Sequence, residues 1–173
     1  MPRSEPPVNS RSYTFYVTVL MVILIDQIAK LLVVATVPLF DSVSIIPHLF
    51  DITYVRNTGL AYGLLDNSTM PYKRVITGGL AVAALAGIAL YARQMSKDLN
   101  EKWSQIGLAL ILGGAIGNIL DRVRLGYVID YVDVYWRGWH FWAFNVADAA
   151  ISIGAVFVFA ELFLGKRHAS RPV

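Results

Sequence analysis

The most constraining feature of the sequence is a set of long runs without charge. Residues 75–92 and 103–120 are uncharged runs of 18 residues each, and 13–37 and 145–165 are apolar runs of similar length with isolated charged residues. A helix of about 20 apolar residues spans the hydrocarbon core of a bilayer. The sequence therefore predicts an all-α membrane protein with four transmembrane helices.

Composition narrows the function classes that remain. Hydrophobic residues make up 56% of the 173 residues and charged residues 16%, whereas soluble domains carry about 25% charged residues. A disordered chain, a collagen-like chain and an ordinary soluble enzyme are therefore excluded. The sequence has no cysteine, its three histidines are scattered, and H-E-x-x-H is absent. These features argue against a disulfide framework, a cysteine nucleophile and a zinc peptidase, so neither a metal nor a cofactor is expected.

The polar segments divide the chain into two tails and one domain. Residues 1–12 are polar with three prolines and predict a flexible tail, and residues 166–173 form a basic C-terminal tail. Between them, 13–165 is expected to be a single four-helix domain. A cleaved signal peptide is the alternative for 13–37, but that run is too long and contains an internal Asp and Lys.

One segment between the first two spans is predicted to be β structure. Residues 38–72 contain helix-breaking prolines and short β-branched and aromatic runs separated by turn residues. We expect a small extramembrane β-cradle over about 40–65. Residues 121–144 mix charge with Tyr and Trp, a composition typical of the headgroup level of a membrane.

Four spans place both termini on the same side of the membrane. The two tails and the loop 93–102 hold eight Lys and Arg residues, against six on the other side. The positive-inside rule therefore predicts cytoplasmic termini, with the β-cradle and 121–144 facing outward. The net charge of +3 fits basic residues at a membrane surface, and no nucleic-acid partner is expected.

Ionisable residues within spans are costly and mark functional sites. Asp26 and Lys30 lie four residues apart on one helical face, where they can pair; a purely structural ion pair is the alternative. Glu161, close to the basic tail, is expected to reach the membrane surface without a catalytic role. With the termini inside, a set of polar residues gathers at the outer half of the bilayer: Asn57, Asn118, Asp121, Arg122, Asp130, Asp133, Asn145 and Asp148.

A pair of aspartates offers a reaction that needs neither metal nor cysteine. Two neighbouring carboxylates cannot both ionise easily, so one can act as general base on water while the other stays protonated. The 17 residues between Asp130 and Asp148 allow the chain to turn back and bring the two together. Asn145, three residues before Asp148, resembles the N-cap of a capping box. For each aspartate alone, the alternative is a hydrogen-bonding residue of the outer leaflet.

Smaller motifs add local expectations. Gly113 and Gly117, spaced as G-x-x-x-G, are expected to form a helix-packing face. The segment NTGLAYG at 57–63 predicts a tight turn with Gly59 and Gly63 that presents Asn57. No G-x-S-x-G occurs, which argues against a serine peptidase.

Five blocks of the sequence together resemble the lipoprotein signal peptidase family, also called signal peptidase II. In the order and spacing of that family, they are DQIAK at 26–30, NTGLAYG at 57–63, GGAIGNILDR at 113–122, VIDYVD at 128–133 and FNVADAAI at 144–151. The resemblance covers about residues 13–165 and implies four transmembrane helices, a small β-cradle outside the membrane, and a catalytic aspartate dyad, Asp130 and Asp148. Residues implied to support the dyad or bind the substrate are Asp26, Lys30, Asn57, Gly59, Asn118, Asp121, Arg122 and Asn145.

The same resemblance implies a reaction and its setting. The reaction is that of an aspartic endopeptidase that removes the signal peptide from diacylglyceryl-modified prolipoproteins by cutting before the lipidated cysteine. The implied location is the bacterial cytoplasmic (inner) membrane, with the active site near the outer face. We expect a multi-pass monomer in contact with membrane lipids.

Rival functions from other classes are a small proton-coupled transporter and an assembly scaffold. In the transporter, Asp26, Lys30, Asp121 and Asp148 form a proton relay. Four spans are few for a transporter, and no inverted repeat is evident. A presenilin-type intramembrane aspartyl protease is a further rival, but its Tyr-Asp and Gly-x-Gly-Asp signatures are missing from the sequence.

Overall fold

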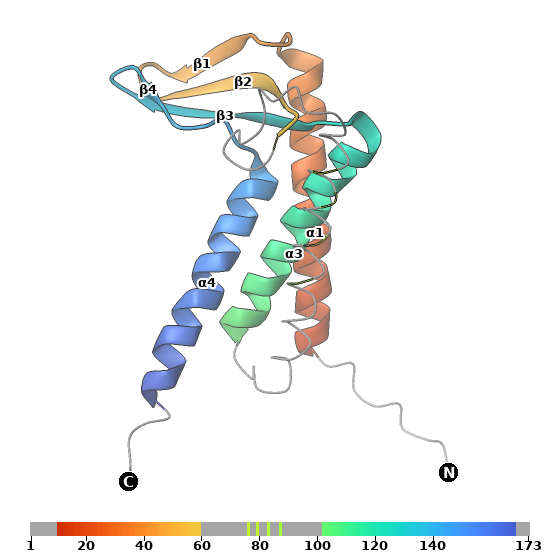
Figure 1. The fold of residues 1–173 in the computed structure, drawn as a ribbon, viewed down its shortest axis with the longest axis vertical. Coiled ribbons are helices and arrows are strands. Elements are labelled where there is room, and N and C mark those ends of the chain that lie inside the picture. The colour runs from red at the N-terminus through yellow and green to blue at the C-terminus, as the bar shows by residue number, and fades with distance from the viewer. Residues whose placement is uncertain are drawn as a thin grey trace.

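A computed structural model describes residues 10–59, 76, 79, 83, 87 and 102–168 of the chain. Within these residues, long helices stand beside one another and a four-stranded sheet lies across one of their ends (Figure 1). The helices are α1 (Ser10–Thr36), α3 (Lys102–Leu125) and α4 (Val146–His168). Because α1 and α3 run toward the sheet and α4 runs away from it, α1 begins and α4 ends at the opposite end of the molecule.

Two of the helices are long and apolar enough to cross a membrane. Among the described residues these candidate spans are Tyr13–Thr36 and Trp103–Leu125, with mean hydropathies of 2.3 and 1.5. The sequence predicted both. The expected span at 75–92 lies outside the described residues, apart from 76, 79, 83 and 87, which are helical.

The helices extend beyond the apolar runs that predicted them. α1 begins at Ser10, inside the segment expected to be a flexible tail, and α4 continues to His168, inside the expected basic tail. α3 continues past residue 120 to Leu125, so Asp121 and Arg122 belong to a helix. Hydropathy marks the apolar middle of a helix, whereas the backbone hydrogen bonds continue through the polar residues at its ends.

Glycines allow the helices to approach closely. A Cβ atom added to Gly113 would lie 2.8 Å from Cβ of Val22 in α1, and one added to Gly107 would lie 2.8 Å from the carbonyl oxygen of Gly154 in α4. Such small residues let helix backbones come together where no hydrophobic force drives them. The packing role expected for Gly113 is confirmed. Gly117 also lies at a helix contact, where it packs against the Asp26 side chain of α1, as described below.

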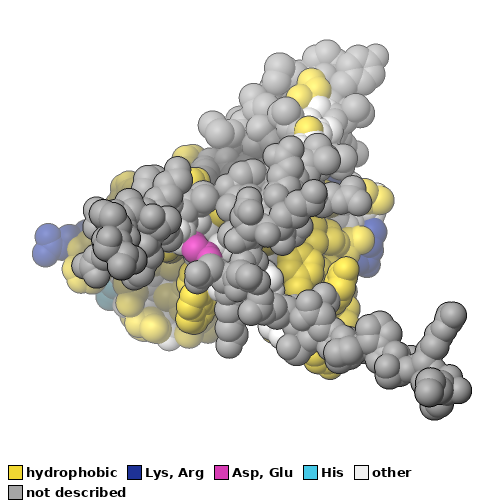
Figure 2. Space-filling view, turned by 90° about the horizontal axis from the view of Figure 1, so that it is seen from below, with side chains coloured by type: hydrophobic (Ala, Val, Ile, Leu, Met, Phe, Trp, Pro, Cys, Tyr) yellow, Lys and Arg dark blue, Asp and Glu magenta, His cyan; other side chains and the backbone are white. Residues whose placement is uncertain are grey.

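The far end of the bundle holds an acidic residue between two helices. Figure 2 looks at this end and shows hydrophobic side chains around an acidic one. Glu161 of α4 accepts a hydrogen bond from the buried hydroxyl of Ser104 in α3 through Oε2, while its buried Oε1 has no hydrogen-bond partner among the described residues. Glu161 is therefore hydrogen-bonded inside the bundle through one of its oxygens, and the expectation that it reaches the membrane surface stays a prediction.

The sheet is antiparallel, with the order β1-β2-β3-β4. Its strands are β1 (Ser42–Ile46), β2 (Phe50–Asn57), β3 (Val128–Trp136) and β4 (Trp139–His140). The β-cradle predicted over about 40–65 therefore supplies only β1 and β2, and residues of that range beyond 59 lie outside the described part. β3 comes from the segment interpreted as a membrane-level aromatic belt. Its two aspartates, Asp130 and Asp133, interrupt the β-branched and aromatic pattern that signals a strand.

Pairing of β2 with β3 brings two distant segments together. Val55 lies opposite Asp130, and Asn57 lies opposite Val128. A small hydrophobic core fixes the sheet on the end of α1, where Val33 and Val37 pack against Tyr54, Ile129 and Tyr131. These contacts hold the strand that carries Asp130 at the end of the helices where the sheet lies.

Candidate active site

The first turn of α4 is closed by a capping box. Asn145 immediately precedes the helix, and its Oδ1 accepts a hydrogen bond from the backbone N–H of Asp148 at 2.9 Å. In return, the backbone N–H of Asn145 donates to Oδ2 of Asp148 at 3.3 Å. This reciprocal pair satisfies two donors at the helix start and confirms the arrangement expected from the spacing. It also fixes the Asp148 carboxylate at the positive end of the helix, which favours negative charge.

Asp130 faces the same asparagine from β3. The side-chain amide of Asn145 donates to Oδ1 of Asp130 at 2.7 Å, and that of Asn57 donates to Oδ2 at 2.9 Å. Asp130 is 3% exposed, so both oxygens are held by protein groups. Asn145 therefore contacts both aspartates, one through its side chain and the other through its backbone and side chain together.

Burial controls the charge on Asp130. Loss of water around the carboxyl and the nearby negative charge of Asp148 raise the pKa of Asp130 from its ordinary value of 3.8 to about 7. The two asparagine donors oppose that rise because they favour the carboxylate. A carboxyl with a pKa near neutrality can both hold and release a proton at physiological pH.

Asn118 of α3 links Asp148 to a buried cation. Its Nδ2 donates to Oδ1 of Asp148 at 2.7 Å, while its Oδ1 accepts from Nζ of Lys30 at 3.1 Å. A lysine ammonium can only donate, and so this contact fixes which end of the Asn118 amide faces Asp148. The side-chain amide of Asn145 also donates to Oδ1 of Asn118, at 3.2 Å.

Lys30 lies between two carboxylates. Its Nζ is 2.8 Å from Oδ2 of Asp26 and 2.8 Å from Oδ2 of Asp121, and all three side chains are buried. Each of these two aspartates also accepts a hydrogen bond from a backbone N–H group of the site. Asp26 accepts from the N–H of Ala147 at 3.0 Å, and Asp121 accepts from the N–H of Ile129 at 3.2 Å. The pairing of Asp26 with Lys30 predicted from their spacing is confirmed, and the network ties α1 and α3 to α4 and β3.

Gln27 also belongs to this network, although it is not among the site residues that the sequence predicts. Its amide nitrogen donates to Oδ1 of Asp121 at 3.0 Å and to Oδ2 of Asp26 at 3.2 Å, and its Oε1 accepts from Arg124 at 3.1 Å. The signal in the sequence that could have identified Gln27 is its position directly after Asp26, on the helix that carries Asp26 and Lys30. Gly117 completes this corner, because a Cβ atom there would lie 2.7 Å from Oδ2 of Asp26.

Arg122 connects α3 to the turn after β2. Its Nη2 donates to the carbonyl of Gly59 at 3.1 Å and its Nη1 to the carbonyl of Asn118 at 3.3 Å. The N–H of Gly59 donates to Oδ1 of Asn57 at 2.9 Å, which leaves the amide nitrogen of Asn57 directed at Asp130. The expected turn is present as far as Gly59, and Gly63 lies outside the described residues.

All ten candidate residues therefore lie in one connected cluster. Asp133, which is also expected at this depth, lies outside the cluster. Its Oδ2 is within hydrogen-bond distance, 2.8 Å, of Nδ1 of His140 on the hairpin formed by β3 and β4. In the described ranges, no three His, Asp, Glu or Cys side chains are grouped to hold a metal ion. The arrangement supplies two carboxyls that lie in different surroundings and share one asparagine. Two carboxyls in different surroundings can take the separate roles of acid and base.

Comparison with known proteins shows the family to which the chain belongs. The family model described as signal peptidase (SPase) II matches residues 18–164, a range that contains every residue of the cluster. The chain belongs to the signal peptidase II family. As a member of a family of bacterial membrane peptidases, it is a protein-cleaving hydrolase, and this membership favours the peptidase over the transporter and the scaffold.

Individual relatives agree with the family match. The lipoprotein signal peptidase of Geobacter metallireducens is 40% identical over 163 residues, which cover 94% of this chain and 97% of the relative. That of Pseudomonas fluorescens strain Pf0-1 is 39% identical over 149 residues, or 86% of each chain. A solved structure of a bacterial membrane enzyme, determined by the in meso method, superposes with a TM-score of 0.75 at 26% identity, covering 92% of this chain and 94% of the other.

Proposed function

We propose that this signal peptidase II is an aspartic endopeptidase that removes the signal peptide from diacylglyceryl-modified prolipoproteins, cutting before the lipidated cysteine. Lipoprotein signal peptidases among the relatives support the class of substrate. The observation that carries the aspartic mechanism is the contact of Asn145 with both Asp130 and Asp148. It supports a dyad in which Asp130 and Asp148 are the catalytic residues.

The proposed reaction begins at Asp148. As a carboxylate, it takes a proton from water while the water oxygen bonds to the scissile carbonyl carbon. Asp130, protonated up to about pH 7, transfers its proton to the carbonyl oxygen and so neutralises the charge that develops there. The tetrahedral intermediate then returns a hydroxyl proton to Asp130, Asp148 protonates the leaving nitrogen, and the C–N bond breaks. The signal peptide leaves with a new carboxyl group, and the lipidated cysteine keeps the new amino group.

The remaining residues have positioning roles in this proposal. Asn57 and Asn145 donate hydrogen bonds to the two oxygens of Asp130. Asn118 accepts a hydrogen bond from Lys30 and donates one to Asp148, and so links the lysine to that carboxyl. Asp26 and Asp121 orient Lys30 and fix the backbone of α4 and β3. Arg122 and Gly59 hold the turn that presents Asn57. Pre-organisation of this kind lowers the reorganisation needed in the transition state.

We further propose a single multi-pass domain over about 13–165 in the inner membrane, with four spans and cytoplasmic termini. Support comes from the candidate spans in α1 and α3 and from the shared end at which α1 begins and α4 ends (Figure 1). The site then lies near the outer face, at the opposite end of the helices. No additional copy is needed to complete the cluster, which supports a monomer.

A cleavage assay tests this function. Purified protein in detergent is incubated with a diacylglyceryl-modified prolipoprotein and, separately, with the unlipidated form, and products are resolved by gel shift and mass spectrometry. We expect cleavage of the lipidated form alone, directly before the modified cysteine, and none by Asp130→Asn. Cleavage of both forms at equal rates, or at another bond, would contradict the proposed specificity.

A further inference from the structure

An apolar hollow opens at the hairpin formed by β3 and β4. It has a volume of about 320 Å³ and is lined by Leu49, Val134, Tyr135, Trp136, Trp139, Phe141 and Phe144. Each of these side chains is aliphatic or aromatic. Trp136 and Trp139 are more than 60% exposed, so the hollow is open at the side of the hairpin and can be entered from there.

Two lining residues of the hollow, Val134 and Trp136, share one face of β3 with Asp130, whereas Tyr135 lies on the other face. Side chains alternate across a strand, and so Asp130, Val132, Val134 and Trp136 point to the same side. No register shift interrupts β3 between Asp130 and Val134, because the irregularity in the pairing lies on β2 between Ile52 and Val55. Val134 therefore follows Asp130 at about 13 Å along the same face.

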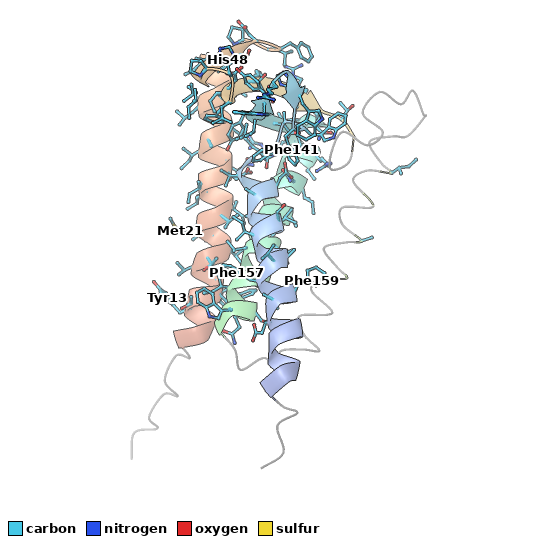
Figure 3. The ribbon with its side chains drawn as sticks, turned by 90° about the vertical axis from the view of Figure 1, so that its left-hand side faces the viewer. Tyr13, Met21, His48, Phe141, Phe157 and Phe159 are labelled. Carbon is cyan, nitrogen blue, oxygen red and sulfur yellow. The ribbon has the colours of Figure 1, made fainter. Side chains whose placement is uncertain are left out.

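The other wall of the hollow begins at the second half of the site. Phe144 directly precedes Asn145, and its carbonyl accepts from the N–H of Tyr131 and of Val132. Phe141 donates its N–H to the carbonyl of Val134. Figure 3 shows Phe141 nearer to the level of the helices than His48, which lies at the far end of the molecule. The hollow thus lies along β3 about 13 Å from Asp130, and its other wall includes the residue that precedes Asn145.

This position meets a requirement of the proposed substrate. The lipidated cysteine follows the scissile bond directly, so its glyceryl group starts a few bonds from the dyad and its hydrocarbon chains need an apolar surface nearby. We infer that the hollow lined by Val134, Trp139, Phe141 and Phe144 is the binding site for an acyl chain of the substrate's diacylglyceryl group. The inference rests on the proposed function and adds the residues by which the enzyme distinguishes lipidated from unlipidated protein.

Filling the hollow tests the inference. Val134→Phe places a larger side chain in it, and Val43→Phe, on β1 and outside the hollow, is the matched control with a similarly exposed valine. Substrates carry either long acyl chains of about sixteen carbons or short ones of about eight, because binding strength grows with each buried methylene. For Val134→Phe we expect KM to rise roughly tenfold with long chains and by less than about twofold with short ones. Val43→Phe should leave both KM values unchanged.

Two results would overturn the acyl-chain site. One is an unchanged ratio of the long-chain KM to the short-chain KM in Val134→Phe, whether the two values stay the same or rise equally. The other is the same change of that ratio in Val43→Phe. Wild-type cleavage of the long-chain substrate is measured in the same series. Its absence would count against the proposed function, whereas its presence with an unchanged ratio would count against the hollow alone.

A cross-linking experiment locates the chain without relying on cleavage. The Asp148→Asn protein, reconstituted in phospholipid vesicles, is irradiated with a prolipoprotein that carries a photoreactive group at the end of one acyl chain. We expect labelled peptides from 134–144, and loss of that label when non-photoreactive lipidated substrate is added. Labelling confined to the helices would contradict the site. So would labelling of 134–144 by a photoreactive phospholipid that substrate does not displace, because the hollow would then hold bilayer lipid.

Discussion

Asn145 and Asp148 exchange two hydrogen bonds across the first turn of α4, and the same Asn145 side chain donates to Asp130. One residue therefore determines both where the helix begins and where the two carboxyls lie relative to each other. The helix start and the site are built by the same contacts, so the geometry of the dyad depends on the fold of a single turn.

Substitution of Asn145 separates these two roles. Asn145→Ala removes the cap and the donor to Asp130, and we expect a loss of about 1 kcal/mol of stability together with a fall in kcat of roughly a hundredfold or more. Asn145→Ser retains a capping oxygen but cannot reach Asp130. It should recover the melting temperature of the wild type and not its kcat. Recovery of both by serine would show that Asn145 acts as a cap alone.

The activity should fall on the alkaline side of neutrality. Because burial and the charge of Asp148 raise the pKa of Asp130 to about 7, the acid of the dyad loses its proton above that pH. We expect kcat/KM to decrease with an apparent midpoint of about 7, since this ratio reports groups of the free enzyme. Asp133→Asn, which changes a carboxyl on the hairpin, should keep the same midpoint. A wild-type profile that stays flat to about pH 9 would contradict the assignment of Asp130 as the acid.

The same pKa makes stability depend on pH. In the unfolded chain Asp130 ionises near its ordinary value of 3.8, whereas in the folded protein it ionises at about 7. The folded state therefore binds a proton that the unfolded state has released, and stability falls as pH rises between these values, by roughly 4 kcal/mol in total. Asp130→Asn removes this dependence. Thermal unfolding in detergent should show a smaller fall between about pH 5 and 8 for the variant than for the wild type.

Lys30 is expected to be the costliest single residue of the network to remove. Lys30→Met leaves Asp26 and Asp121 buried without their cation, and loss of one partner from a buried ion pair costs about 3–5 kcal/mol. Asp121→Asn in the same chain removes one of the two uncompensated charges. Thermal unfolding should therefore show the double variant to be more stable than Lys30→Met. The opposite order would mean that Asp121 does not depend on Lys30.

Gly117 should tolerate no side chain. In Gly117→Ala the added Cβ would lie 2.7 Å from Oδ2 of Asp26, so we expect a loss of about 1–3 kcal/mol from the forced shift. Gly79→Ala is the control, because a Cβ there meets nothing within 4 Å. Its melting temperature should match or exceed that of the wild type, since alanine favours a helix. Equal melting temperatures for Gly117→Ala and wild type would show that Asp26 can move aside.

Features within one element could be predicted from the sequence. The spacing of Asn145 and Asp148 encodes the capping box, and the four-residue separation of Asp26 and Lys30 encodes their pair, because helix geometry alone brings such residues together. The candidate spans of α1 and α3 follow from hydropathy in the same way.

Features that join distant elements could not be predicted locally. The contact of Lys30 with Asp121 and the bond from Gln27 to Asp121 depend on how α1 packs against α3. The composition of residues 121–144 predicts an aromatic belt at the membrane surface, because Asp130 and Asp133 interrupt the strand pattern of β3. The strand becomes evident from its pairing with β2. The hydrogen bond of Asn57 to Asp130 depends on that same pairing.

Single-turnover cleavage of a diacylglyceryl-modified prolipoprotein tests whether Asp130 and Asp148 act as one catalytic unit. Asp130→Asn, Asp148→Asn and the double variant are compared with wild type at matched folding, verified by thermal unfolding. We predict that each single variant loses at least about a thousandfold in rate and that the double variant is no slower, because residues of one unit show non-additive losses. A folded single variant that cleaves at the wild-type rate, or losses that multiply in the double variant, would contradict the dyad.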